Sequence, residues 1–406
     1  MKLLVLTQYF WPENFPINDV VAGLVERGHA VTVYAGQPNY PAGRFYDGYG
    51  LSGPFRETYK GALVKRVPLL PRGAGGAVRL MLNYLSHALS ATLLAPFVAR
   101  GRFDAILVYE PSPMTIGVPA RALRALKRAP VALWVQDLWP ESLSATGAVR
   151  NPMVLRAVDM LIKWIYRGCD RVLVQSQAFI ASVEAHGVEP GRIRYLPNSA
   201  EALYRRLEPS PADAEAKELP AGFRVIYAGN IGAAQDFPSM LAAADLLRHE
   251  KQIQWIVFGD GRMRAWVEEQ IRARGLGETF HLLGSRPSQS MPRYFAHAGA
   301  LLATLRREPI FAYTIPSKIQ SYIACGRPVI AALEGEGGRL IREAAAGWVV
   351  PPEDPRALAD AVLAASRTAA WELDAMGRRG EEVFRGQFER EKVLSRLEEF
   401  LLELRR

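Results

Sequence analysis

The sequence predicts an α/β protein made of two successive doubly wound domains. Short apolar runs alternate with helical patterns, this alternation begins again after residue 222, and a polar stretch at 207–222 separates the two series. Strands that are buried on both faces and joined through helices form parallel sheets with right-handed crossovers. A length of 406 residues also fits two domains better than one core.

The first series begins with a strand at 3–9 and a helix at 17–27, which Gly28 ends. Helical stretches separate most of the later strands, which we expect at 30–36, 62–70, 104–111, 130–138, 170–176 and 193–199. We place this N-terminal domain at 1–206.

The second series begins with a strand at 223–230, a helix at 237–250, a strand at 253–261 and a helix at 262–275. The remaining strands are predicted within 279–285, 299–305, 327–333 and 347–352. We place the C-terminal domain at 207–386, which leaves a helix-rich tail at 387–406.

The composition is that of an ordinary globular protein, with 49% hydrophobic and 22% charged residues. The two cysteines, Cys169 and Cys325, lie far apart and outside any CxxC or histidine-rich spacing. We therefore expect no disulfide framework, no metal site and a reduced cytoplasmic location. The sequence has no uninterrupted apolar run of about 18 residues, so it predicts no transmembrane helix.

The positive charge is concentrated in the first half of the chain. Residues 1–200 hold 22 basic and 13 acidic residues, whereas basic and acidic residues balance in the remainder. An apolar helical stretch at 72–102 carries four arginines, and a second basic patch comprises Arg121, Arg124, Lys127 and Arg128. Such a surface can lie on anionic lipid, so we expect a peripheral protein on the inner face of the cytoplasmic membrane. A core helix is the alternative reading of 72–102, because apolar periodicity does not separate the two.

Glycine-rich turns follow two strands of the C-terminal domain. Gly229 and Gly232 follow the first strand, and Gly259-Asp260-Gly261 follows the second. Ligands bind doubly wound sheets at the carboxyl ends of the strands, and a backbone without side chains can approach a phosphate there. Tight turns that require glycine are the alternative.

The segment 308–333 carries a more specific pattern. Pro316 ends one element, Ser317 is predicted to cap a helix over 318–325, and Gly326 ends it. A helix start that carries a hydroxyl and Lys318 is suited to a diphosphate. The alternative is a lysine on a solvated helix end.

Two motifs of the N-terminal domain place polar groups at strand ends. In WVQDLWPES (134–142), Asp137 could bond an acceptor hydroxyl or a sugar, or cap the next helix. In YFWPENFPIND (9–19), Glu13 and Asn14 occupy the first loop.

These motifs, together with YAGNIGAAQD, VFGDG and PSKIQSYIACGRPVIAALEGEGG, resemble glycosyltransferase family four over nearly the whole chain. The resemblance is greatest to putative L-fucosamine and colanic-acid-type transferases. It implies the GT-B fold, in which two Rossmann-like domains face across a cleft. It further implies a C-terminal domain that binds the nucleotide sugar, an N-terminal domain that binds the acceptor, and a C-terminal helix that returns to the N-terminal domain. The implied reaction is retaining, metal-independent and without a cofactor.

Several positions depart from the family pattern. The two glutamates of the Glu-x7-Glu signature fall at Tyr313 and Ser321, so Glu334 and Glu336 become candidates for holding the ribose. The usual arginine and lysine fall at Asn230 and Gln235, which leaves Lys318 with Arg306 or Arg307 to meet the diphosphate charge. Gln136 replaces a histidine that reaches the O6 side of the sugar in relatives, which favours a 6-deoxy donor.

We therefore predict transfer of an N-acetylated amino sugar, such as L-FucNAc, from a UDP donor to a lipid-linked saccharide. The predicted catalytic residues are Lys318 and Asp137. The predicted donor-binding residues are Gly229, Asn230, Gln235, Gly259, Gly261, Arg286, Arg306, Ser317, Ser321, Glu334 and Glu336. The predicted acceptor-binding residues are Glu13, Asn14, Asn39, Gln136 and Glu141.

Three alternatives remain. A nucleotide-sugar 2-epimerase shares the architecture but would leave the basic half unexplained. A nicotinamide dehydrogenase would need the full G-x-G-x-x-G, which the sequence lacks. A sequence pI near 9.6 suggests a nucleic-acid-binding protein, but no recognised module appears and aromatic residues do not interleave with the basic runs, so we expect no nucleic-acid partner.

Overall fold

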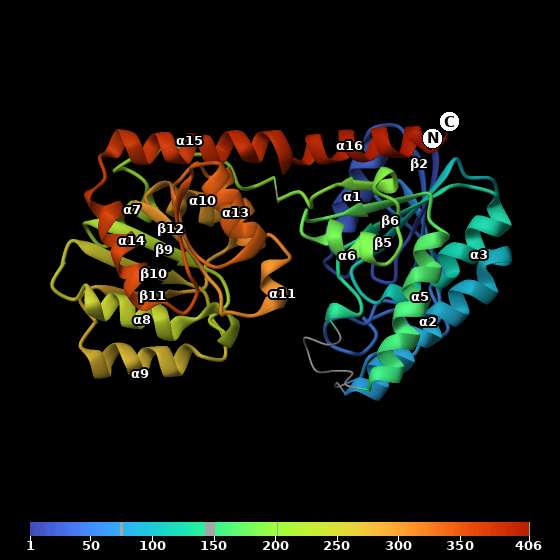
Figure 1. Cartoon of the computed structure of the whole chain (residues 1–406), viewed down its shortest axis with the longest axis horizontal. Coiled ribbons are helices and arrows are strands. Elements are labelled where there is room, and N and C mark those ends of the chain that lie inside the picture. The colour runs from blue at the N-terminus through green and yellow to red at the C-terminus, as the bar shows by residue number, and fades with distance from the viewer. Residues whose placement is uncertain (74–75, 143–150, 201, 406) are drawn as a thin grey trace. The chain divides into compact units, whose positions relative to one another are not determined.

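The computed structural model describes residues 1–73, 76–142, 151–200 and 202–405, which form two compact units (Figure 1). The first unit contains residues 1–198 and 393–406, and the second contains 199–392. The first boundary thus lies before 199 rather than before 207. The connecting segment packs with the second unit, because Tyr204 stacks on Phe295 at 6.2 Å and Arg206 pairs with Asp374.

The first unit is built on an eight-stranded sheet in the order β3-β4-β2-β1-β5-β6-β7-β8. The strands are β1 (Lys2–Leu6), β2 (Ala30–Gly36), β3 (Arg56–Tyr59), β4 (Ala62–Val67), β5 (Ala105–Glu110), β6 (Val131–Val135), β7 (Arg171–Val174) and β8 (Ile193–Tyr195). All neighbours are parallel except β3 and β4. The edge strand β3 was not predicted, because its sequence RETY has no buried apolar run.

Helices cover both faces of this sheet. On one face, α1 (Pro16–Glu26) and α16 (Arg390–Glu403) share a core with the strands, to which α16 contributes Val393, Leu394, Leu397 and Leu401. On the other face lie α2 (Ala77–Val98), α3 (Gly117–Lys127) and α5 (Pro152–Arg167), with α3 in contact with both its neighbours (Figure 1). A short helix, α6 (Phe179–Ala185), joins β7 to β8.

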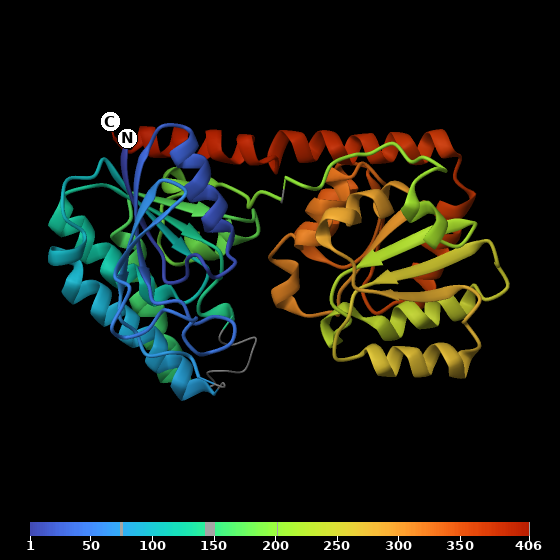
Figure 2. The ribbon, with the colours of Figure 1, turned by 180° about the vertical axis from the view of Figure 1, so that it is seen from behind.

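The second unit has a six-stranded, fully parallel sheet in the order β11-β10-β9-β12-β13-β14 (Figure 2). The strands are β9 (Phe223–Ala228), β10 (Ile253–Phe258), β11 (Phe280–Gly284), β12 (Ala300–Thr304), β13 (Val329–Ala332) and β14 (Gly347–Val350). The predicted class, two parallel-sheet Rossmann-like domains, is confirmed.

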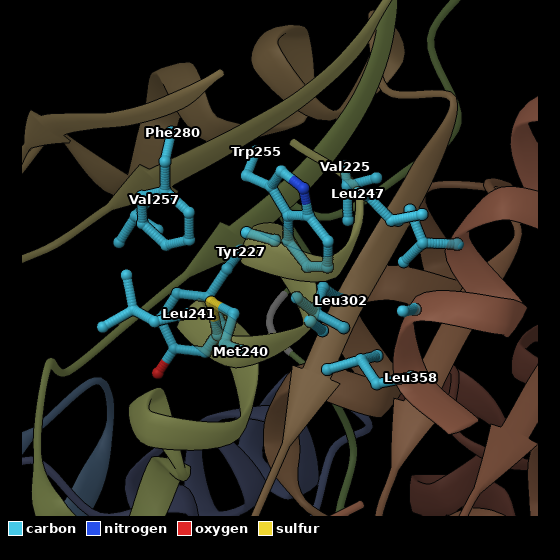
Figure 3. Close-up of a cluster of buried hydrophobic side chains, with 14 of the residues drawn as sticks. Val225, Tyr227, Met240, Leu241, Leu247, Trp255, Val257, Phe280, Leu302 and Leu358 are labelled. Atoms are coloured by element: carbon cyan, nitrogen blue, oxygen red, sulfur yellow. The ribbon is translucent and has the colours of Figure 1, made fainter. Parts of the chain in front are cut away.

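The helices of the second unit divide between two cores. One core includes α8 (Phe237–Leu246), α9 (Arg264–Arg274) and α14 (Pro355–Arg367), and Figure 3 shows Tyr227, Trp255 and Leu241 within it. The other includes α10 (Met291–Ala296), α12 (Ser317–Ala324), α13 (Gly335–Glu343) and α15 (Ala370–Gln387). Two short helices, α7 (Ala214–Glu218) and α11 (Pro309–Ala312), complete the unit.

Candidate functional site

The second unit has its topological switch point between β9 and β12. From β9 the chain proceeds outward through β10 and β11, and from β12 it proceeds the other way through β13 and β14. Ligands of open α/β sheets bind at the carboxyl ends of strands at such a point. The predicted Gly229-Asn230 and Gly259–Gly261 turns follow β9 and β10 at this edge.

Lys318, in the first turn of α12, lies over the turn that follows β9. Its ammonium donates a hydrogen bond to the hydroxyl of Tyr227 at 2.5 Å and lies 3.8 Å from the centre of that ring. The Tyr227 hydroxyl in turn donates to the carbonyl of Asn230 at 2.7 Å. Burial lowers the pKa of Lys318 to about 7. A lysine with a lowered pKa is thus held at the switch point of the second sheet.

The two glycine turns require glycine because they touch each other. Gly229 and Gly259 have φ angles of 140° and 141°, which residues with a side chain rarely adopt. A Cβ on Gly259 would lie 1.9 Å from the carbonyl oxygen of Gly229, and a Cβ on Gly229 would lie 2.6 Å from Cε of Lys318. A Cβ on Gly261 would lie 2.3 Å from the carbonyl oxygen of Ile231. These glycines are packed against one another and against Lys318.

A pocket of about 360 Å³ opens beside these turns. Arg286 stands on its wall, where it donates to Glu218 at 3.0 Å and to the carbonyl of Leu283 at 2.8 Å. The pocket is lined by Tyr204, Ala228, Gly229, Asn230, Phe258, Gly259, Asp260, Ser285, Arg286, Ser288 and Met291. Four predicted donor-binding residues, Gly229, Asn230, Gly259 and Arg286, therefore line one pocket of the second unit, and Lys318, which was predicted to be catalytic, packs against Gly229.

The predicted capping of α12 by Ser317 is wrong. Pro316 occupies the N-cap position, and Ser317 is the first helical residue, with an exposed side chain. Proline has no N–H and fits the segment before a helix, which leaves the Ser317 hydroxyl free of the capping role. At the start of α8, the N-cap is Asp236, whose side chain accepts a hydrogen bond from the backbone N–H of Ser239. Gln235 is half-buried just before that cap.

The remaining charged candidates of the second unit are held in ion pairs. Glu336 is buried, and its carboxylate accepts hydrogen bonds from Nε and from one Nη of Arg339, each at 2.9 Å. Glu334 pairs with Arg307, and Arg306 pairs with Glu353, each at 3.3 Å. Ser321 is half-buried on α12. The structure gathers these charges into local pairs and does not bring them onto the pocket lining.

In the first unit, the Glu13 side chain links its own loop to the loop that follows β2. Its carboxylate is fully buried and accepts three backbone N–H groups, from Phe10 at 3.0 Å and from Asn39 and Tyr40 at 2.8 Å. Burial nevertheless raises the pKa of Glu13 to about 7. Asn39 is also buried, with Oδ1 accepting the N–H of Arg72. The acceptor contacts predicted for Glu13 and Asn39 are therefore corrected, since both side chains tie loops together, whereas Asn14 is exposed.

A carboxylate pair lies where β5 and β6 end. Glu110, the last residue of β5, is fully buried, and burial together with the Asp137 carboxylate raises its pKa well above the ordinary value. Burial likewise raises the pKa of Asp137, which accepts a hydrogen bond from the Ser142 hydroxyl. Asp137 is half-buried and can reach solvent.

The other two predicted residues of this motif, Gln136 and Glu141, are hydrogen-bonded to other segments of the first unit. Gln136 accepts from Asn198 at 2.6 Å, and Glu141 accepts from Ser182 at 2.5 Å. Asp137 and Glu141 are both half-buried, and Asp137 is the one whose carboxylate acts on buried Glu110.

Sequence reasoning missed Tyr227 and Tyr204. Tyr227 reads as one more apolar residue of a buried strand, and Tyr204 lies in a segment assigned to the first domain. Only the position of an aromatic residue two places before Gly229 could have drawn attention to Tyr227.

Two family models match the chain. A glycosyl transferase 4-like domain matches residues 17–199, and the glycosyl transferases group 1 domain matches residues 222–367. Each match falls on one of the two Rossmann-like units.

Curated relatives and a solved structure agree with these models. A probable glycosyltransferase of Pseudomonas aeruginosa, WbjE, is 29% identical over 56% of this chain and 57% of its own length. The putative colanic acid biosynthesis glycosyl transferase WcaI of Escherichia coli is 26% identical over 82% of this chain and 84% of its own. The structure of Anabaena Alr3699/HepE in complex with UDP superposes with a TM-score of 0.71 at 17% identity, over 99% of this chain and all of that chain. The chain therefore belongs to glycosyltransferase family four and has the GT-B fold.

Proposed function

We propose that this glycosyltransferase moves an N-acetylated amino sugar, such as L-FucNAc, from a UDP donor to a lipid-linked saccharide. The saccharide would belong to a bacterial surface polysaccharide: an O-antigen, a capsule or an exopolysaccharide. The enzyme would act at the inner face of the cytoplasmic membrane. The similarity to a colanic acid biosynthesis protein supports the pathway, and the UDP complex of a protein of the same fold supports the nucleotide. Gln136 supports a donor without a 6-hydroxyl group.

The arrangement of Lys318, Tyr227 and Gly229 carries the proposal. Because Gly229 has no side chain, Lys318 packs directly against its backbone, and a Cβ at this position would lie 2.9 Å from the Lys318 ammonium. A buried ammonium interacts with an anion more strongly than a solvated one, because the low dielectric of the site screens it less. In the proposed complex Lys318 neutralises the diphosphate as negative charge develops on it.

The proposed reaction retains the configuration at the sugar carbon. The bond between C1 and the β-phosphate oxygen breaks, the acceptor oxygen forms a bond to C1 from the same face, and the acceptor proton passes to the departing phosphate. This route uses no protein nucleophile, and we propose that it is metal-independent because Lys318 and backbone N–H groups meet the developing charge.

We propose that Asp137 orients the acceptor hydroxyl. It is half-buried at the carboxyl edge of the first sheet, and Ser142 fixes its carboxylate. Because this carboxylate is already held in one geometry, it can accept a hydrogen bond from the acceptor hydroxyl with little further loss of side-chain entropy.

Thermal unfolding against UDP, GDP, ADP, dTDP and NAD tests the donor. A ligand at about 100 times its dissociation constant stabilises the folded state by about 2.7 kcal/mol. We expect a selective rise with UDP that Lys318→Met reduces and Asp137→Asn leaves intact, while Asp137→Asn loses sugar transfer. A rise with NAD alone, or with none of these nucleotides, would reject the proposal.

A further inference from the structure

The outer side of α2 is apolar along its whole length. Its exposed residues recur every three or four positions, which places them on one face of the helix. These side chains are between 45% and 76% exposed: Val78, Leu82, Leu85, Leu89, Leu93 and Phe97. The opposite side of the helix is already used, because Tyr84, Ala88, Ala91 and Ala95 are buried.

The same surface continues over α3 and α5. The helix α3 contacts both α2 and α5, and the three lie side by side on one face of the first sheet (Figure 1). Exposed apolar side chains on them are Leu126 of α3 and Met153, Val154, Met160 and Trp164 of α5. Together with the α2 residues named above and Met81 of α2, these residues make up twelve of the twenty exposed large hydrophobic side chains among the described residues. Large exposed patches of this kind mark an interaction surface.

The charge of the three helices is almost entirely positive. They carry seven basic residues, Arg79, Arg121, Arg124, Lys127, Arg156, Lys163 and Arg167, and one acidic residue, Asp159. Asp159 is paired with Lys163 at 2.9 Å, and Arg124 is paired at 2.7 Å with Asp170, which lies outside these helices. Arg121 stacks on the ring of Trp164 at 4.2 Å, so cation and apolar anchor meet at one point.

These properties select one occupant. A second copy of the chain docked through the same face would set one predominantly cationic patch against another, since a two-fold interface pairs a patch with itself. An anionic bilayer offers hydrocarbon for the leucines and phosphates for the cations, each cation near such a leaflet contributing about 1 kcal/mol. Within the described residues no helix is long and apolar enough to cross a membrane, so the face would lie on the bilayer.

We infer that the outer face of α2, α3 and α5, which we call the α2–α5 face, docks on an anionic lipid bilayer, with the apolar side chains entering the acyl boundary. The inference deepens the proposed function, which requires a lipid-borne acceptor. It extends the sequence prediction by adding α5, whose Met160 and Trp164 are also exposed.

Co-sedimentation of the full chain with vesicles tests the inference. The vesicles are phosphatidylglycerol mixed with phosphatidylethanolamine, or phosphatidylcholine alone, at about 150 mM salt, where surface charges are screened beyond about 8 Å. We expect at least tenfold stronger binding to the anionic vesicles. The double variant Leu85→Glu/Leu89→Glu should lose at least tenfold, and Arg156→Glu/Arg167→Glu should lose most of the difference between the two lipids.

The matched control is Leu246→Glu/Trp371→Glu, which changes two exposed apolar residues of the second unit and should bind vesicles as the wild type does. All variants are compared by thermal unfolding with and without UDP. Equal vesicle binding by wild type and Leu85→Glu/Leu89→Glu, or no binding by wild type, overturns the inference. A wild-type dimer that this variant converts to a monomer would assign the face to self-association instead. Because the vesicles contain no sugar, failure here is distinct from failure of UDP binding.

Discussion

Lys318 and Tyr227, which lie 91 positions apart in the sequence, meet at the switch point of the second sheet, with the ammonium 3.8 Å from the ring centre. The contact explains how a lysine is accommodated at a largely buried place. The aromatic face and the hydroxyl offer partial compensation for lost water, and burial still lowers the lysine pKa to about 7.

Removing the Lys318 charge should abolish most activity. Lys318→Met keeps the apolar stem but not the ammonium, and loss of one group that stabilises developing charge costs about 10²–10³-fold in kcat. Steady-state transfer assays and thermal unfolding measure the effect. The control is Lys251→Met, an exposed lysine of the same unit that pairs with Glu278. Activity of Lys318→Met within about threefold of wild type would remove Lys318 from the reaction.

UDP binding should take up a proton through Lys318. With a pKa of about 7 in the free protein, the amine is mostly neutral at about pH 8, and a bound diphosphate favours its charged form. Uptake should therefore approach one proton at about pH 8 and diminish towards about pH 6, where the amine is already charged. Calorimetry in buffers of different ionisation enthalpy measures it. The same proton uptake in Lys318→Met as in wild type would contradict this assignment.

Gly259→Ala should destabilise the second unit. The new Cβ would lie 1.9 Å from the Gly229 carbonyl, at a φ of 141°. Strain and steric overlap of this kind cost about 2–4 kcal/mol in the free energy of unfolding. Gly277→Ala is the control, because a Cβ there meets nothing within 4 Å, and it should change stability by less than about 0.5 kcal/mol. Chemical denaturation compares the two, and equal stabilities would contradict the packing.

Glu13→Ala should act on stability. Three backbone N–H groups lose their acceptor, and buried unsatisfied donors cost about 1–3 kcal/mol each before relaxation or entry of water. We expect a loss of at least about 2 kcal/mol, whereas Asn14→Ala, at the exposed neighbouring position, should be close to neutral. A raised KM for the acceptor in Glu13→Ala without loss of unfolding free energy would restore the contact predicted from the sequence.

Glu110 should make stability fall as pH rises. Its folded pKa is raised by burial and by Asp137, so the folded state holds a proton that the unfolded state releases above about pH 4.5. The contribution of Glu110 is complete below that pH and is lost as pH rises towards the folded pKa. Glu110→Gln keeps the shape without the proton, so denaturation at about pH 5 and pH 8 should show a smaller loss in the variant. An unchanged slope would mean that Glu110 is ionised in the folded protein.

The first sheet shows which strands can be predicted from the local sequence pattern. The predicted strand at 30–36 coincides with β2, and most other strands lie within their predicted ranges, because continuous apolar runs report burial on both faces. The edge strand β3 was not predicted, because its residues are partly exposed and its pairing with β4 depends on a turn at Lys60-Gly61.

The candidate site divides in the same way. Pro316 and Gly326 mark α12 locally, so the sequence could place Lys318 near the start of a helix, although it named the wrong cap. No periodicity could show that this helix start lies over Gly229. That contact depends on the order of β9, β12 and β13 in the sheet.

The sequence by itself determined the α/β class, the two parallel sheets, the glycine turns at strand ends and the excess of positive charge in the first half. Those properties follow from burial and backbone preference, which act over a few residues. Only the tertiary structure decided that Glu13 accepts hydrogen bonds from Asn39 and Tyr40, and that Lys318 contacts Tyr227. It also decided that α5 and α2 contribute to one apolar face. Each of these depends on which distant segments the chain crossovers bring together, and a buried polar or exposed apolar side chain acquires its role from that neighbour.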